Sequence, residues 1–417
     1  MFGLLKRPSR EEMLGGSIPG VLARLAGPMA VGIVAVLAFG LVDAYFIGQL
    51  GPEELAAVAF TFPLSFLVSG VAMGLSVGTS TAVARAVGRD DGTACRLSVH
   101  SLLLSLLAVA AIAGVGFLSL DPALRLMGAG EELAGLAAPY MRVWYGGIVL
   151  LVVPMVGNGA LRGVGDTVSP TVVMLISGLV NLILDPCLIF GLGPFPRLEL
   201  PGAAWATVIS WAVILLASLG LLRWRGLLSW AEATGGSVWA SWREVLVIGL
   251  PAVGTNLLVP VGAAVLTRVA AGFGAPVVAA YGVGARVEAL ALVGVMAVGS
   301  VNSIFVGQNW GAGKCDRVRE AASRVLTFGA VYGLGTWTLL VLFRRPIAAA
   351  FSEESAAVVD AAALYLLLVP VGHAGLAGTM LSSGVFNALK KPARSVLVLS
   401  ARLFALCVPL AVLGAWT

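Results

Sequence analysis

Residues 168–192 read VSPTVVMLISGLVNLILDPCLIFGL, an apolar run that is long enough to span a bilayer as a helix. Within it, Asn181 and Asp185 are four residues apart, so they share one helix face, and Pro186 favours a bend because it removes a helix hydrogen bond. A carboxylate at membrane depth costs roughly 2.5–3.5 kcal/mol on insertion scales. We therefore expect a function for Asp185. The alternative is that Asp185 lies at the membrane face, beside the turn at 191–196.

The composition is that of an integral membrane protein. The chain has 417 residues, of which 59% are hydrophobic and 11% are charged, and its mean hydropathy is +0.99. Soluble domains carry about 25% charged residues. The first apolar run is a full span rather than a cleaved signal. The net charge of +5 indicates oriented membrane loops and no nucleic-acid partner.

Hydropathy predicts an all-α, multi-pass protein with eleven spans joined mostly by short Gly/Pro turns. A polar linker, Trp224–Arg243, interrupts the middle of the chain. The predicted spans are Val21–Gln49, Glu54–Ala84, Arg96–Leu118, Glu131–Met155, Val168–Leu192, Pro201–Arg223, Glu244–Phe273, Pro276–Gln308, Asp316–Leu342, Ala356–Asn387 and Ala393–Trp416.

Basic residues gather on one side of this topology. Of the 26 Lys and Arg residues, 18 fall at the ends that share a side with the N-terminus and only 5 at the opposite ends. This bias predicts a cytoplasmic N-terminus in the cytoplasmic (inner) membrane.

The two halves repeat at an offset of 223 residues, most clearly where Pro28 matches Pro251 and Gly88 matches Gly311. An even number of spans per copy predicts parallel repeats with a cleft between two lobes. The expected domains are an N-terminal six-helix lobe (1–225), a linker (226–243) and a C-terminal lobe (244–417). At this offset the second copy lacks a counterpart of the sixth span, as in a twelve-span design without its last helix.

Three acidic residues fall well inside predicted spans: Asp43, Asp185 and Glu288. Two carboxylates at one depth, Asp43 and Asp185, can bind a small cation or hold a proton. Neutral oxygens from Asn181, Asn158 and Thr207 would complete a hard-cation site. The alternative for Asp43 is an interfacial helix-end residue.

Other polar residues in spans leave two interpretations open. Glu288 is two residues from Arg286, which indicates either local charge compensation or a coupling or substrate role. Arg402 has either a functional role in the C-terminal lobe or, as we favour, an ion pair with an acidic residue. Tyr140 and Trp144 offer aromatic faces to an organic cation, although packing is the simpler interpretation. His100, His373 and the four cysteines carry no functional signal.

The sequence contains no enzyme motif in the structural context that the motif requires. Residues 74–78 match G-x-S-x-G, but they lie in the middle of a span, where Gly70, Gly74 and Gly78 indicate close helix packing. Walker, H-E-x-x-H and dinucleotide motifs are absent from the sequence. We therefore expect neither an enzyme nor an ATP-driven pump, and no cofactor.

Several stretches together resemble the multidrug and toxic compound extrusion (MATE) family, in particular its prokaryotic DNA-damage-inducible branch. The resemblance covers essentially the whole chain and departs from the family at Phe39, where relatives often have tyrosine. The stretches are Asp43 with residues 48–52, residues 77–80 with 84–85, and residues 156–166, 181–186 and 202–207.

This resemblance implies two six-helix bundles around a V-shaped cleft, and a monomeric antiporter that exports amphipathic organic cations in exchange for Na⁺ or H⁺. It places the coupling site, and the Na⁺ ligands if sodium is used, at Asp43, Asn181, Asp185 and Thr207. The expected substrate contacts are Asn158, Tyr140, Phe39, Glu288 and Arg402. The alternative is a lipid or lipid-linked oligosaccharide flippase, but only Arg142, Arg286 and Arg402 lie within spans to bind a pyrophosphate headgroup.

Overall fold

The computed structural model describes residues 7–414, apart from 230, 232–233 and 352–354. Lys6, which the topology places on the inner side, and Trp416, the predicted end of the last span, lie outside the described residues. The described residues form helices joined by short connections, with no strand among them. A helix satisfies its own backbone hydrogen bonds, which an apolar chain in a bilayer requires.

The N-terminal half begins with a short helix whose N-terminus has a capping box between Ser9 and Glu12. Six predicted spans follow, of which the fourth is divided in two. The helices are α1 (Arg10–Gly15), α2 (Ile18–Gly48), α3 (Pro52–Arg89), α4 (Ala94–Leu126), α5 (Glu131–Gly146), α6 (Ile148–Gly163), α7 (Val168–Phe190) and α8 (Leu200–Trp224).

The C-terminal half begins at Val238, inside the predicted linker, because Ser237 caps the helix through the Ala240 amide. Its helices are α10 (Val238–Ala271), α11 (Ala275–Ala291), α12 (Val293–Gly311), α13 (Cys315–Leu342), α14 (Arg344–Phe351), α15 (Ala356–Leu368), the 3₁₀ turn η2 (Val369–Gly372), α16 (His373–Ala388), α17 (Pro392–Ser400), the π-helical turn η3 (Ala401–Cys407) and α18 (Val408–Gly414).

The described helices confirm the prediction of an all-α protein with eleven spans. Nine are long and apolar enough to cross a membrane, and the number rises to eleven when each bent pair counts as one span. The pairs are α5 with α6, bent by 48°, and α11 with α12, bent by 51°. The sequence analysis missed both bends. α7 continues through Pro186 as one α-helix.

The two halves follow the predicted repeat with one exception. Pro52 begins α3 and Ala275 begins α11 at the offset of 223 residues. The same offset relates Gly147, at the break between α5 and α6, to Pro370 in η2. However, α3 is one unbroken helix, whereas its counterpart is divided into α11 and α12.

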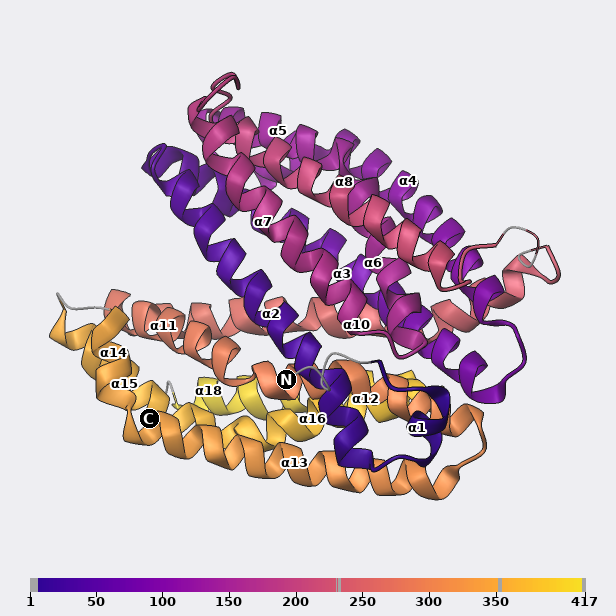
Figure 1. The fold of residues 1–417 in the computed structure, drawn as a ribbon. Coiled ribbons are helices and arrows are strands. Elements are labelled where there is room, and N and C mark those ends of the chain that lie inside the picture. Colours follow the sequence, from indigo (N-terminus) through magenta and orange to yellow (C-terminus); the bar gives the residue numbers. More distant parts are fainter. Residues whose placement is uncertain (1–6, 230, 232–233, 352–354, 415–417) are drawn as a thin grey trace.

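Figure 1 shows the helices of the two halves as two bundles that meet near one end and diverge toward the other. The contact between them uses small residues of α3. A Cβ atom at Gly78 would lie 2.5 Å from the Val245 carbonyl oxygen of α10, and one at Gly74 would lie 2.7 Å from the Val253 nitrogen. The predicted close packing at these glycines is therefore confirmed, and the helix that they approach is α10.

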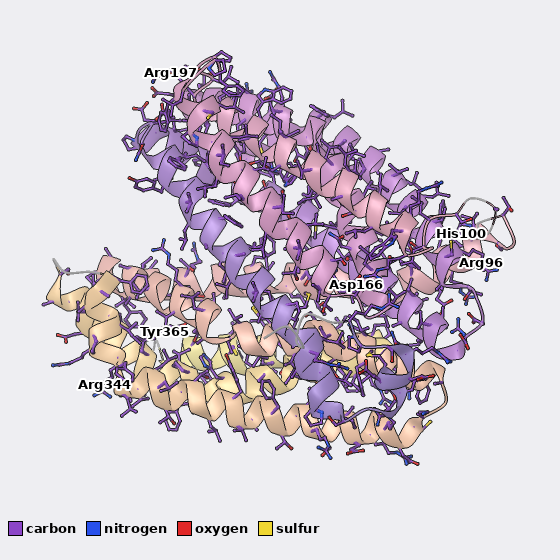
Figure 2. The ribbon with its side chains drawn as sticks, viewed as in Figure 1. Arg96, His100, Asp166, Arg197, Arg344 and Tyr365 are labelled. Carbon is purple, nitrogen blue, oxygen red and sulfur yellow. The ribbon has the colours of Figure 1, made fainter. Side chains whose placement is uncertain are left out.

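A buried ion pair fixes α7 against the C-terminal end of α8. The Asp166 side chain is fully buried and accepts hydrogen bonds from Arg225 Nε (2.9 Å) and Ser169 Oγ (2.8 Å). Because Asp166, labelled in Figure 2, precedes α7 and Arg225 follows α8, the pair sets the position of both helices.

We expect Asp166→Ala to destabilise the protein by about 3 kcal/mol, because it leaves a partly buried guanidinium without its carboxylate. Thermal unfolding in detergent micelles measures this effect. Asp316→Ala is the matched control, since the Asp316 side chain is 99% exposed and its pair with Arg319 contributes little. An equal melting temperature for both variants would contradict this role of Asp166.

Candidate functional site

Contacts between α2 and α7 bring Asp43 to the level of Asp185. The Thr171 hydroxyl donates to the Pro28 carbonyl oxygen (3.2 Å), and the Phe39 ring lies against Gly178, where no Cβ atom would fit. The two helices therefore run in the same direction. Asp43 and Asp185 each lie five residues before the C-terminal end of their helix, about 7–8 Å along the axis.

The two acids lie close to each other, Asp185 buried and Asp43 partly exposed. Asp185 is 1% exposed, and its Oδ1 accepts a hydrogen bond from Asn181 Nδ2 (3.1 Å). Asp185 Oδ2 and Asp43 Oδ1 are buried and have no hydrogen-bond partner among the described residues. Asp43 and Asp185 interact electrostatically with each other and with the buried Tyr140 of α5. Buried acceptors without donors can hold a proton or a cation.

Thr207 lies at the level of Asn181. Ser177 Oγ donates to the Ser210 carbonyl (2.8 Å), and the Leu198 amide donates to the Leu188 carbonyl (2.9 Å). These bonds fix α7 and α8 as antiparallel neighbours, and their register sets Thr207 opposite Asn181. Thr207 therefore lies about one helical turn from the level of Asp185.

Asn158 is not brought to this cluster. Its Oδ1 accepts a hydrogen bond from Ser218 Oγ (3.0 Å), and Ser218 lies eleven residues beyond Thr207 on α8, roughly 16 Å along the axis. The expectation that Asn158 adds an oxygen beside Asp43 and Asp185 is therefore not met. Its hydrogen-bond partner Ser218 belongs to the C-terminal part of α8.

The aromatic residues of α5 are part of the hydrophobic core. Trp144 is 5% exposed and packs edge-on against Trp211 of α8, with 5.3 Å between ring centroids. Tyr140 belongs to the same core cluster. Packing, the simpler of the two interpretations of this aromatic pair, accounts for Trp144, whereas Tyr140 additionally interacts electrostatically with the two acids.

In the C-terminal bundle, Glu288 has a partner that the sequence analysis missed. Its Oε1 lies 3.4 Å from Nε2 of His373, which is 2% exposed. Charge compensation by Arg286 is therefore not what the structure shows, and the conclusion that His373 carries no signal is corrected. The two residues are 85 positions apart, so helix periodicity could not relate them.

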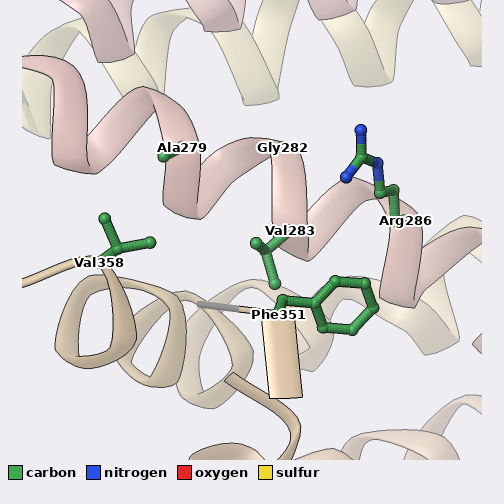
Figure 3. Close-up of a pocket in the computed structure, with 6 residues that line it drawn as sticks. All are labelled: Ala279, Gly282, Val283, Arg286, Phe351 and Val358. Carbon is green, nitrogen blue, oxygen red and sulfur yellow. The ribbon is translucent and has the colours of Figure 1, made fainter. Parts of the chain in front are cut away.

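Arg402 also departs from expectation. It lies in the π-helical turn η3, and its buried Nε has no hydrogen-bond partner among the described residues. No ion pair with an acid is found for it there. Arg286 instead lines a pocket of about 330 Å³ between α11 and α14–α15, with Val283, Phe351 and Val358 (Figure 3).

At the end where the bundles meet, two residues related by the repeat offset make matching contacts across the interface. Arg85 Nη1 of α3 donates to the Ala388 carbonyl at the end of α16 (3.4 Å), and Gln308 Nε2 of α12 donates to the Gly163 carbonyl at the end of α6 (2.9 Å). Glu244 of α10 pairs with Arg85 at 3.1 Å. The repeat could have predicted that Arg85 and Gln308 occupy equivalent positions, because the two residues are separated by its offset.

The fold and the repeat agree with comparisons to known proteins. The MatE family model matches residues 28–187 and 251–413, two segments whose starts are separated by the same offset of 223 residues. The chain belongs to the MatE family. As a MatE protein it is a multi-pass membrane transporter and not an enzyme.

Similar MatE proteins carry different names. The "FAD transporter" of Shewanella oneidensis is 37% identical over 98% of this chain and 90% of its own length. The "Probable multidrug resistance protein YoeA" of Bacillus subtilis is 28% identical over 73% of this chain and 67% of its own length. A solved structure of the Vibrio cholerae MATE transporter VcmN in the bent form has a TM-score of 0.90 and 29% identity, covering 96% of this chain and 90% of that one. These relatives support export of a substrate across a membrane.

Proposed function

We propose that this MatE protein is a secondary antiporter that exports an organic substrate in exchange for Na⁺ or H⁺ bound at Asp43 and Asp185. The observation that carries this proposal is the pair of carboxylates on α2 and α7, each with a buried oxygen that has no partner among the described residues. Asn181 and Thr207 are the neutral oxygens of the same site.

The chemistry of the site follows from charge. A sodium ion would take oxygen ligands from Asp43, Asp185, Asn181 and Thr207, whereas a proton would bind one carboxylate. Either cation reduces the negative charge buried between α2 and α7. We propose that this change alters the packing of the two helices where Phe39 lies against Gly178, and that the lobes 1–225 and 244–417 rock in response.

We further propose that the N-terminus is cytoplasmic and the membrane is the inner membrane, as the distribution of Lys and Arg favours. In this orientation the two bundles diverge toward the outside, where Arg197 and Arg344 lie in Figure 2. Asp43 and Asp185 would then receive the coupling cation from the outer side, down its gradient.

Two substrate classes compete. The multidrug names of several relatives favour amphipathic organic cations, which the buried acids and Tyr140 would attract. The Shewanella relative favours a second candidate, the anionic dinucleotide FAD, for which Arg286 and Arg402 of the C-terminal bundle are the basic groups within spans. The two candidate substrates therefore differ in the sign of their charge.

The test is transport by purified protein in proteoliposomes under an imposed Na⁺ or H⁺ gradient, with ethidium as the cationic probe and FAD as the anionic probe. We expect one gradient to drive one probe against its concentration, and the other gradient to have little effect. Equal transport without any gradient would contradict antiport. Transport of FAD alone would replace the organic cation with the second candidate.

A further inference from the structure

The short helix α1 contacts both bundles at the end where they meet. Its first residue, Arg10, hydrogen bonds with α3 of the N-terminal bundle. Its C-terminal part, from Met13 onward, accepts hydrogen bonds from α12 and α13 of the C-terminal bundle. Figure 1 shows α1 beside α12. This one segment therefore bridges the two halves of the molecule.

The contact with the N-terminal bundle is made by Arg10, which caps the C-terminal end of α3. Its Nε donates to the Val87 carbonyl (3.0 Å), its Nη2 donates to the Gly88 carbonyl (3.1 Å), and its Nη1 lies 3.4 Å from Asp90 Oδ2. Carbonyls in the last turn of a helix have no donor inside the helix. Because the Arg10 side chain is 41% exposed, water can replace Arg10 at these carbonyls when α1 and α3 separate.

The contact with the C-terminal bundle is more extensive. Asn309 Nδ2 (3.2 Å) and Arg317 Nη2 (3.3 Å) both donate to the Met13 carbonyl. Lys314 Nζ donates to the Leu14 carbonyl (2.9 Å). The Met13 side chain is 1% exposed and belongs to a core cluster with residues of α2, α12, α13 and α16. The C-terminal bundle therefore supplies both the donors that cap α1 and the apolar surface that covers it.

The two attachments differ in what their loss would cost. A helix of six residues is marginal in water by itself, so α1 depends on partners outside the helix. Separation from the C-terminal bundle would remove those partners and expose Met13 to water, whereas separation from α3 frees only the guanidinium of Arg10. The attachment to α3 is therefore the weaker of the two.

Arg10 binds α3 at a point of close approach between the bundles. Backbone atoms of Gln308 in α12 occupy the space of a Cβ atom at Gly88, whose carbonyl accepts from Arg10. Asn309, which donates to α1, is the next residue after Gln308. Since α1 is held by α12 and Arg10 is held by α3, movement of α3 away from α12 requires the bonds of Arg10 to break.

We propose that α1 is a clasp that holds the two bundles together at this end, and that it opens by release of Arg10 from α3. This inference rests on the proposed rocking of the lobes 1–225 and 244–417. Only hydrogen bonds and one ion pair break when the clasp opens, and α1 stays on the C-terminal bundle. A single exposed side chain makes the attachment weak enough to open and close in each transport cycle.

Maleimide labelling of Thr81→Cys tests the clasp, because Thr81 is fully buried beside Gly307 of α12. Arg10→Ala in this background should raise the labelling rate, corrected for the native cysteines, about 5-fold, since it removes hydrogen bonds from a charged group. Glu11→Ala is the matched control, an exposed neighbour on the same helix, and should leave the rate unchanged. Equal rates in the Arg10→Ala, Glu11→Ala and parent proteins would overturn the proposal.

Amide hydrogen exchange of residues 9–16 follows α1 itself. In Arg10→Ala these amides should stay protected, which also shows that faster labelling of Thr81→Cys is not unfolding, whereas Arg317→Ala should reduce their protection. Loss of protection in Arg10→Ala would overturn the assignment of α1 to the C-terminal bundle. Neither measurement uses a substrate or a gradient, so failure of antiport in proteoliposomes would leave both results as expected.

Discussion

Asp43→Asn and Asp185→Asn should each remove nearly all gradient-driven export while the protein still inserts and folds. Asparagine keeps the shape of the side chain but cannot take up a proton, and it reduces the charge available to a sodium ion. Because Asp185 is 1% exposed and one oxygen of each acid lacks a partner among the described residues, removing the charge should not destabilise the bundle. Initial rates in proteoliposomes under the effective gradient measure the loss.

Asp121→Asn is the matched control for these variants. Asp121 also lies near the end of an N-terminal helix, but its side chain is 61% exposed and pairs with the exposed Arg142. Its export rate should stay close to that of the unmodified protein. Undiminished export by both site variants would remove Asp43 and Asp185 from the coupling mechanism and leave the family assignment untouched.

Gly88→Ala and Gly311→Ala should each weaken the contact between the bundles at their closed end. Backbone atoms of Gln308 occupy the space of a Cβ atom at Gly88, and backbone atoms of Arg85 occupy that space at Gly311. Overpacking of this kind costs about 1–3 kcal/mol, which shifts a two-state equilibrium about 5- to 150-fold. We expect the arrangement with α3 and α12 in contact to lose that much population.

Maleimide labelling of Thr81→Cys measures this change, because Thr81 is fully buried beside Gly307 of α12. The labelling rate, corrected for the four native cysteines, should rise in both glycine variants. Gly114→Ala is the control, since no heavy atom lies within 4 Å of a Cβ atom there. Equal labelling in all three variants would show that the contact tolerates the added methyl groups.

Much of the site was readable before the fold was known. The cost of a charge in a bilayer makes Asp43 and Asp185 candidates, because both fall inside apolar spans of the sequence. A four-residue spacing places Asn181 on the face of Asp185, where the hydrogen bond is found. The depth of Asp43 relative to Asp185 required the packing of Phe39 on Gly178, a contact between residues 139 positions apart. Asn158 was misplaced for the same reason, because depth in a bundle depends on helix register.

The sequence by itself determined the helical membrane fold, the repeat and the small-residue face of α3, because each follows from hydropathy, turn residues or helix periodicity. Tertiary structure decided the rest. Local sequence does not record which helix Gly78 approaches, where α11 breaks from α12, or that Glu288 meets His373. These features depend on how helices distant in the sequence pack against each other. A buried polar group then contacts the partner that this packing places beside it.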